Sequence, residues 1–229
     1  MALNKARTSI WVKTLIIILI VAFISLFMYS GIAGLFDLFK PTPGQTTATL
    51  TPAQAVAAIN QKHQPTIDAL KALAASQPAS YTATVNLANG YFDWGQELSQ
   101  PQTGQSQVST ESIAAAEQVW PQARAAYDAA TKLKAFDAGV QTDRAAATFY
   151  SSDATGAIAI ARNVTKKQPT FAPAWLNLGI FYDATGNSVS AVSSYQKYLV
   201  LDPKGNNVAY AQQRLKALAS GSTSGTTSP

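Results

Sequence analysis

The chain has 229 residues, of which 47% are hydrophobic and only 13% charged, with a net charge of +5 at neutral pH. Residues 41–229 contain 13 basic and 11 acidic side chains, so this part lacks the excess of basic residues that is typical of nucleic-acid binding. Cysteine is absent and His63 is the only histidine, which excludes disulfides, sulfur-ligated metal sites and two-histidine metal sites.

Residues 1–40 are predicted to form a cytoplasmic N-terminus and a transmembrane signal-anchor helix. Thr14–Phe36 is a run of 23 residues without a charge, and a helix of that length spans roughly 34 Å, enough for a bilayer core of about 30 Å. Basic residues are concentrated before this run, so the positive-inside rule predicts a single-pass protein with residues 41–229 outside the cytoplasm. Gly31 and Ala33 also resemble a signal-peptidase site, which leaves cleavage after about Ala33 as the alternative.

Two further segments are predicted between the anchor and the main domain. Residues 41–52 contain three prolines and no helical period, which indicates a linker. Residues 53–80 are rich in alanine and end near Pro78, which indicates a leading helical region.

The rest of the chain has a helical pattern that repeats. Pro169 and Pro203 lie 34 residues apart, and each closes a similar predicted helix. Residues 221–229 consist mostly of glycine, serine and threonine and contain no large apolar residue, which predicts disorder. The predicted segments are residues 81–137 as a first unit with an insertion at about 96–118, 138–171 as a degenerate second unit, 172–205 as the clearest third unit, 206–220 as a capping helix and 221–229 as a disordered tail.

The third unit carries the most specific pattern. Small residues stand between large ones at fixed positions of two predicted helices. These positions are Trp175, Leu178, Gly179, Tyr182, Ala191, Tyr195 and Tyr198. At these positions the sequence resembles the tetratricopeptide repeat (TPR) family. Gly179 and Ala191 leave room for two antiparallel helices to approach each other closely, and large rings fill the gaps beside them. The resemblance implies an all-α fold, a superhelix of antiparallel helix pairs.

The sequence offers little catalytic chemistry. His63 lies in a polar stretch near a predicted helix end and is expected to be a solvated surface residue. No nucleophile motif and no phosphate-binding loop accompany it. The sequence therefore predicts a protein that is not an enzyme and that binds no cofactor or metal.

The TPR resemblance implies that the first helix of each unit lines a concave groove that binds a protein or peptide. Asparagine amides can hydrogen-bond an extended peptide backbone, and aromatic rings offer apolar platforms. Aspartates favour a ligand with basic or neutral polar groups. The candidate groove residues are Asn86, Asn89, Phe92, Asp93, Thr142, Asp143, Phe149, Tyr150, Asn177, Ile180 and Asp183.

An anchor joined to repeats without a catalytic set favours a membrane-anchored scaffold or adaptor that holds a client protein or peptide. The layout is similar to that of bacterial accessory proteins of secretion-translocon or cytochrome c-maturation complexes. One alternative is a structural cell-envelope protein that associates with itself. A more remote alternative is a hydrolase that uses His63.

Overall fold

The computed structural model describes residues 50–102, 105–134 and 136–223, with side chains up to residue 220. These residues belong to one compact unit and form helices without any strand, so the all-α prediction is confirmed for the described part of the chain. The described helices are α3 (Pro52–Ser76), α4 (Tyr81–Leu98), α5 (Thr110–Leu133), α6 (Ala138–Tyr150), α7 (Ala154–Lys167), α8 (Ala172–Ala184), α9 (Ser188–Leu201) and α10 (Val208–Thr223).

The predicted transmembrane helix over Thr14–Phe36 and the linker up to residue 49 lie outside the described residues. Among the helices that are described, none has both the length and the apolar character needed to cross a bilayer. The membrane anchor therefore stays a prediction from the sequence. At the other end of the chain, α10 continues to Thr223, a few residues into the tail predicted to be disordered.

Short polar side chains fix the start of most of the described helices. In each case a side-chain oxygen just before the helix accepts a hydrogen bond from the backbone N–H three residues later, and such a cap contributes about 1 kcal/mol. Helix α8 has no such side chain and begins instead with a proline in its first turn. The capping residues are Thr51, Ser80, Ser109, Asp137, Asp153 and Asn187.

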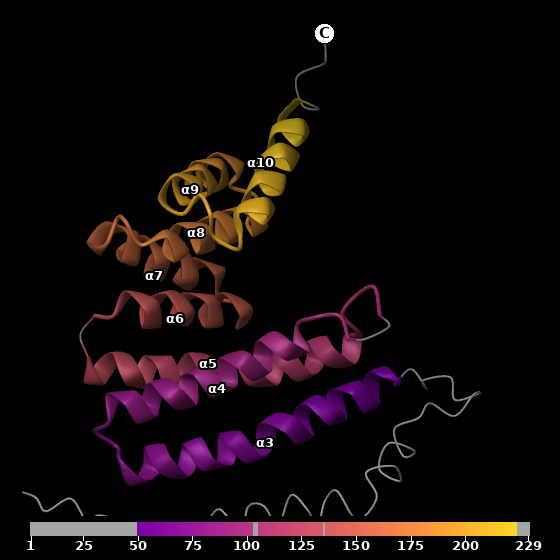
Figure 1. Ribbon diagram of the computed structural model, residues 1–229, viewed down its shortest axis with the longest axis vertical. Coiled ribbons are helices and arrows are strands. Elements are labelled where there is room, and N and C mark those ends of the chain that lie inside the picture. The colour runs from indigo at the N-terminus through magenta and orange to yellow at the C-terminus, as the bar shows by residue number, and fades with distance from the viewer. Residues whose placement is uncertain (1–49, 103–104, 135, 224–229) are drawn as a thin grey trace, which may run out of the picture. The chain divides into compact units, whose positions relative to one another are not determined.

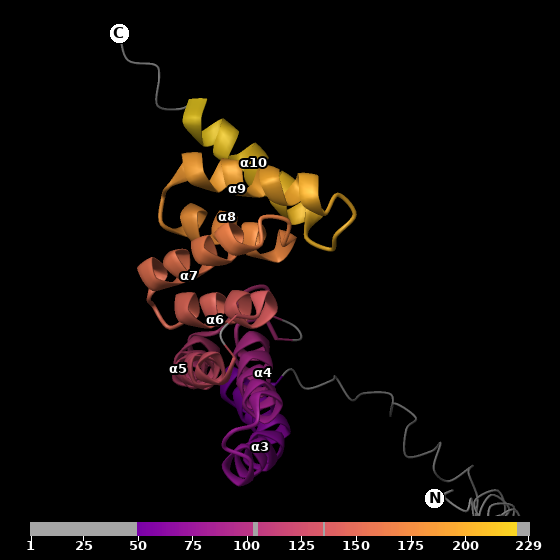
Figure 2. The ribbon, with the colours of Figure 1, turned by 90° about the vertical axis from the view of Figure 1, so that its left-hand side faces the viewer.

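Consecutive helices pack against each other along the whole described unit. The main contacts join α4 to α5, α6 to α7 and α8 to α9, and α10 lies against α9 at the end (Figures 1 and 2). Short turns connect the two members of the last two pairs, so each of these pairs is antiparallel. The described domain is thus a stack of helix pairs, as the repeating pattern predicts.

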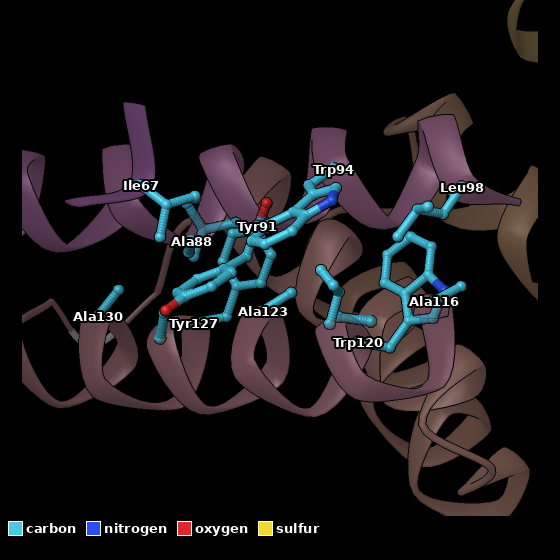
Figure 3. Packing of buried hydrophobic residues seen from close by; sticks show 14 of the residues in the cluster. Ile67, Ala88, Tyr91, Trp94, Leu98, Ala116, Trp120, Ala123, Tyr127 and Ala130 are labelled. Atoms are coloured by element: carbon cyan, nitrogen blue, oxygen red, sulfur yellow. The ribbon is translucent and has the colours of Figure 1, made fainter. Parts of the chain in front are cut away.

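The first pair differs from the predicted first unit. The insertion expected at about 96–118 shrinks to a connection between Leu98 and Thr110, because α4 continues to Leu98 and Ser109 caps α5. Alanine-rich sequence after this cap favours the helix over a loop. The result is an elongated hairpin whose interface carries large rings on both sides (Figure 3). The interlocked residues include Tyr91, Trp94 and Leu98 of α4 and Trp120, Ala123 and Tyr127 of α5.

The last pair follows the repeat pattern closely. A side-chain carbon added at Gly179 of α8 would lie 2.5 Å from Cδ1 of Tyr195 in α9, so only glycine allows this approach. Gly186 makes the turn between the two helices with a φ of 77°, a left-handed conformation that glycine adopts without strain. The buried Tyr195 and Tyr198 then fill the space between α8, α9 and α10.

His63 is not the solvated residue that the sequence predicts. Its side chain is only 13% exposed, and its Nε2 lies 2.7 Å from Oε2 of Glu97. The imidazole also stacks on the Trp94 ring with a centroid distance of 6.0 Å. The polar neighbours of His63 in the sequence face solvent while His63 itself turns towards α4, so His63 helps to join α3 to α4.

Candidate peptide-binding groove

Helices α4 and α6 bring two of the predicted groove carboxylates close together. Asn86, Asn89 and Asp93 recur at intervals of three and four residues, so they share one exposed face of α4. Asp143 comes from α6 and is near enough to Asp93 for the Asp93 charge to disfavour the ionised form of Asp143. The phenol of Tyr127 in α5 lies beneath them and donates a hydrogen bond of 2.8 Å to Oδ1 of Asn89. We call Asn89, Asp93, Tyr127 and Asp143 the acidic cluster.

The acidic cluster places the carboxylate of Asp143 in an unfavourable environment. Burial, followed by the charges of Asp93 and Asp137, raises the pKa of Asp143 from 3.8 to about 6. Burial also raises the pKa of the Tyr127 hydroxyl, with further contributions from Asp143 and Asp93. The phenol therefore stays protonated, and it adds no negative charge to the cluster.

No cation of the protein neutralises this charge within the described ranges. The lysine and arginine ion pairs found there involve other carboxylates, and neither Asp93 nor Asp143 takes part in one. A half-buried carboxylate without a partner costs free energy in the isolated domain. The acidic cluster is therefore complementary to a positively charged group from outside the domain.

An aromatic surface adjoins the acidic cluster. Tyr150 lies two turns after Asp143 on the same face of α6, is 45% exposed, and stacks on Trp120 with a centroid distance of 4.6 Å. Phe92 of α4 packs edge-on against the same Trp120 ring, with a centroid distance of 5.3 Å. Tyr150 thus presents a partly exposed ring that stacks on the buried Trp120.

Three other candidate residues of α6 and α8 serve the interior instead. Thr142 is only 3% exposed, and its backbone oxygen accepts a hydrogen bond from Nδ2 of Asn177. Phe149 stacks on Phe181 at a centroid distance of 4.7 Å, which joins α6 to α8. These side chains hold neighbouring repeats together, so they contribute to the shape of the groove more than to its surface.

The carboxylate of Asp183 already has a cationic partner within the protein. Arg214 of α10 donates to both of its oxygens, at 2.7 and 3.0 Å, and the Tyr195 hydroxyl donates a longer bond of 3.3 Å. The terminal helix thus supplies the cation that a ligand would otherwise bring. Ile180 is likewise partly covered by the aromatic core around α8. The available surface of the predicted groove is concentrated at α4 and α6.

Sequence reasoning missed the residues that connect the helices. Tyr127 marks a second helix in the sequence, but nothing there reveals that its hydroxyl reaches Asn89 on another helix. Arg214 lies in the predicted capping helix, 31 residues from Asp183, and no local pattern links the two. The described residues also contain no group of three side chains that could hold a metal ion.

Comparison with solved structures supports the fold. A crystal structure of MamA aligns with a TM-score of 0.56 and 18% identity over 72% of this chain and 81% of that chain. TTC0263, a thermophilic TPR protein in Thermus thermophilus, aligns with a TM-score of 0.52 and 16% identity over 87% of this chain and 94% of that chain. No protein-family model and no curated protein sequence matches this chain. The chain therefore has a TPR-like fold.

Proposed function

We propose that this protein is a membrane-anchored scaffold that binds a basic peptide segment of a client protein at the acidic cluster on α4, α5 and α6. One observation carries the proposal: Asp143 lies close enough to Asp93 for that charge to raise its pKa, neither carboxylate has a cation among the described residues, and the partly exposed Tyr150 ring stacks on Trp120 nearby. A TPR-like fold without a catalytic set is suited to such a role.

The arrangement would recognise three features of a peptide. A lysine or arginine side chain between Asp93 and Asp143 would relieve their repulsion and form charge-assisted hydrogen bonds. The exposed Asn86 amide can donate to and accept from an extended backbone. The Tyr150 ring offers a platform for an apolar or cationic side chain of the peptide.

The second part of the proposal concerns location. The uncharged run over Thr14–Phe36 and the excess of basic residues before it support a single-pass anchor with the helical domain outside the cytoplasm. A scaffold in that place would hold its client near the membrane, as an accessory factor of a secretion or cytochrome c-maturation complex does.

A peptide array tests the binding step. The full chain, purified in lipid nanodiscs, is applied to an array of peptides whose sequences are varied at random and are known at each position of the array. We expect the bound peptides to be enriched in lysine or arginine, and we expect Asp93→Asn with Asp143→Asn to remove that enrichment. Binding without any preference for basic residues, or with the same preference in the double variant, would contradict the proposal.

A matched control separates the groove from general charge. Glu111→Gln with Glu117→Gln removes the same number of negative charges at exposed positions of α5 outside the acidic cluster, and neither carboxylate takes part in an ion pair of the described residues. We expect this control to keep the preference for basic peptides. Loss of the preference in the control as well would mean that net charge, and not the groove, attracts the peptide.

A further inference from the structure

A second concave surface lies on α7, α8 and α9, apart from the acidic cluster. One hollow of about 470 Å³ is floored by Trp175, Leu178 and Tyr182 of α8. A second hollow of about 340 Å³ shares Trp175 and Ser193 with the first. Together they form a groove, which we call the outer groove, and none of the predicted site residues lines it.

Small side chains explain why this groove exists. Helix α9 carries Ser190, Ser193 and Ser194 where it passes over the α8 rings, and these hydroxyl side chains are too short to fill the space. The indole of Trp175 is held in place by a hydrogen bond of 2.8 Å from its Nε1 to the backbone oxygen of Pro169. The outer groove is therefore preformed, with an aromatic floor.

Two exposed valines of α9 lie on the rim of the outer groove. Val189 is 83% exposed and Val200 is 75% exposed, although valine is usually buried. They lie eleven residues apart with Ser193 and Gln196 between them, so the four residues follow one face of α9 over three turns, roughly 16 Å. A partner helix with apolar residues at the same spacing would match this face.

The same groove is positively charged. Arg162 and Lys166 of α7 line the first hollow, and Lys197 of α9 lines the second. In the described part of the chain, none of these three cations forms an ion pair with a carboxylate. A ligand that fits the groove must therefore combine an apolar side with negative charge.

We propose that the outer groove binds an acidic amphipathic helix of a partner protein. A large apolar side chain of that helix enters the hollow beside Trp175, and flanking carboxylates pair with Arg162, Lys166 and Lys197. This surface would allow the scaffold to hold a second protein while the acidic cluster holds a basic segment. A concave floor favours a protein helix over a lipid surface, which needs protruding apolar residues.

Isothermal titration calorimetry with the full chain in phosphatidylcholine nanodiscs tests the proposal. The probe is a synthetic helical peptide of about four turns with leucines on one face and glutamates on both flanks. We expect Arg162→Glu with Lys166→Glu to weaken binding by about tenfold or more. Ser193→Trp, which fills the hollow from an exposed position, is expected to abolish it.

Matched controls make the result specific. Lys216→Glu reverses an exposed cation of α10 outside the groove and is expected to leave the affinity unchanged. Asp93→Asn with Asp143→Asn is also expected to leave it unchanged, so failure of the basic-peptide proposal would be seen separately. The same probe with lysines in place of glutamates should not bind the Asp93→Asn, Asp143→Asn variant, in which the acidic cluster no longer attracts basic peptides.

Three results would overturn the proposal. The first is wild-type protein that does not bind the acidic probe more tightly than empty nanodiscs do. The second is binding that persists unchanged in Ser193→Trp and in the charge-reversed variant. The third is a wild-type chain that self-associates, or that binds vesicles containing phosphatidylglycerol, in a way that the charge reversal removes, because the groove would then serve another occupant.

Discussion

The pairs α4–α5 and α8–α9 use the same contact, a glycine on the first helix against a ring on the second. Gly95 lies against Trp120 in the first pair, and Gly179 lies against Tyr195 in the second. The second pair obeys the repeat pattern, yet its Asp183 is neutralised by Arg214. The first pair departs from the pattern, yet it helps to form the acidic cluster. The regular repeat pattern therefore identifies the fold, whereas the carboxylates without a cationic partner identify the candidate binding site.

The largest expected effect concerns the glycine contact itself. Gly179→Ala should reduce the free energy of unfolding by about 2–3 kcal/mol, because the new methyl group would lie 2.5 Å from the ring of the fully buried Tyr195. Urea denaturation followed by circular dichroism measures this change. Gly139→Ala is the matched control, since its new methyl group would meet no atom closer than 3.4 Å. Equal destabilisation by both variants would contradict the proposed role of close approach.

The next largest effect is expected at the ion pair between Asp183 and Arg214. Arg214→Met should reduce the free energy of unfolding by about 1–2 kcal/mol, because Asp183 loses its cation while remaining largely buried. Asp183→Asn in the same background should recover part of this loss. Chemical denaturation of the two variants and of the double variant gives the coupling energy. A coupling energy of zero would mean that α10 does not depend on this ion pair.

Removing a charge from the acidic cluster should have the opposite effect and increase the free energy of unfolding. Asp143 has a higher pKa in the folded state than its ordinary value, so folding favours its protonated form, and stability falls as pH rises from about 4 to about 6. Asp143→Asn should therefore stabilise the protein by about 1–2 kcal/mol at neutral pH, after allowance for solvent screening. Thermal unfolding across this pH range measures both effects. A destabilised variant at neutral pH would show that Asp143 has a favourable partner.

A smaller effect is expected where α3 joins α4. Lys62, and then His63, lower the pKa of Glu97. This stabilisation is present above the unfolded pKa of the carboxyl and is lost as pH falls through the lower folded value. Glu97→Gln should reduce the free energy of unfolding by less than about 1 kcal/mol at neutral pH, since the pair is partly exposed. Urea denaturation at neutral and acidic pH checks that the variant and wild type converge in acid.

Much of the fold could be predicted from the sequence, because close helix packing requires small residues at fixed spacing. This requirement is visible in the sequence at Gly179 and Ala191, and the prolines after each unit mark where the helices end. The length of α4 and α5 was not predicted, because the contact between Gly95 and Trp120 on two different helices leaves no periodic signal in the sequence. The environment of His63 was missed for a similar reason, since its partners Glu97 and Trp94 lie on another helix.

The candidate site was predicted only in part. Repeat positions identify which side chains come from the first helix of each unit, so Asn86, Asn89, Asp93 and Asp143 could be named in advance. They do not identify which of these side chains find partners inside the protein. Asp93 and Asp183 look alike in the sequence, and only the path of α10 distinguishes them.

The most direct test of the acidic cluster measures the affinity of one lysine-containing peptide, selected from the array, at two pH values. Calorimetry with the full chain in nanodiscs should give binding several-fold tighter at about pH 7.5 than at about pH 5, because Asp143 is ionised only above its pKa of about 6. Asp143→Asn should weaken binding at the higher pH and remove the pH dependence. Equal affinity at both pH values, unchanged in Asp143→Asn, would contradict the proposal that the acidic cluster binds a basic segment.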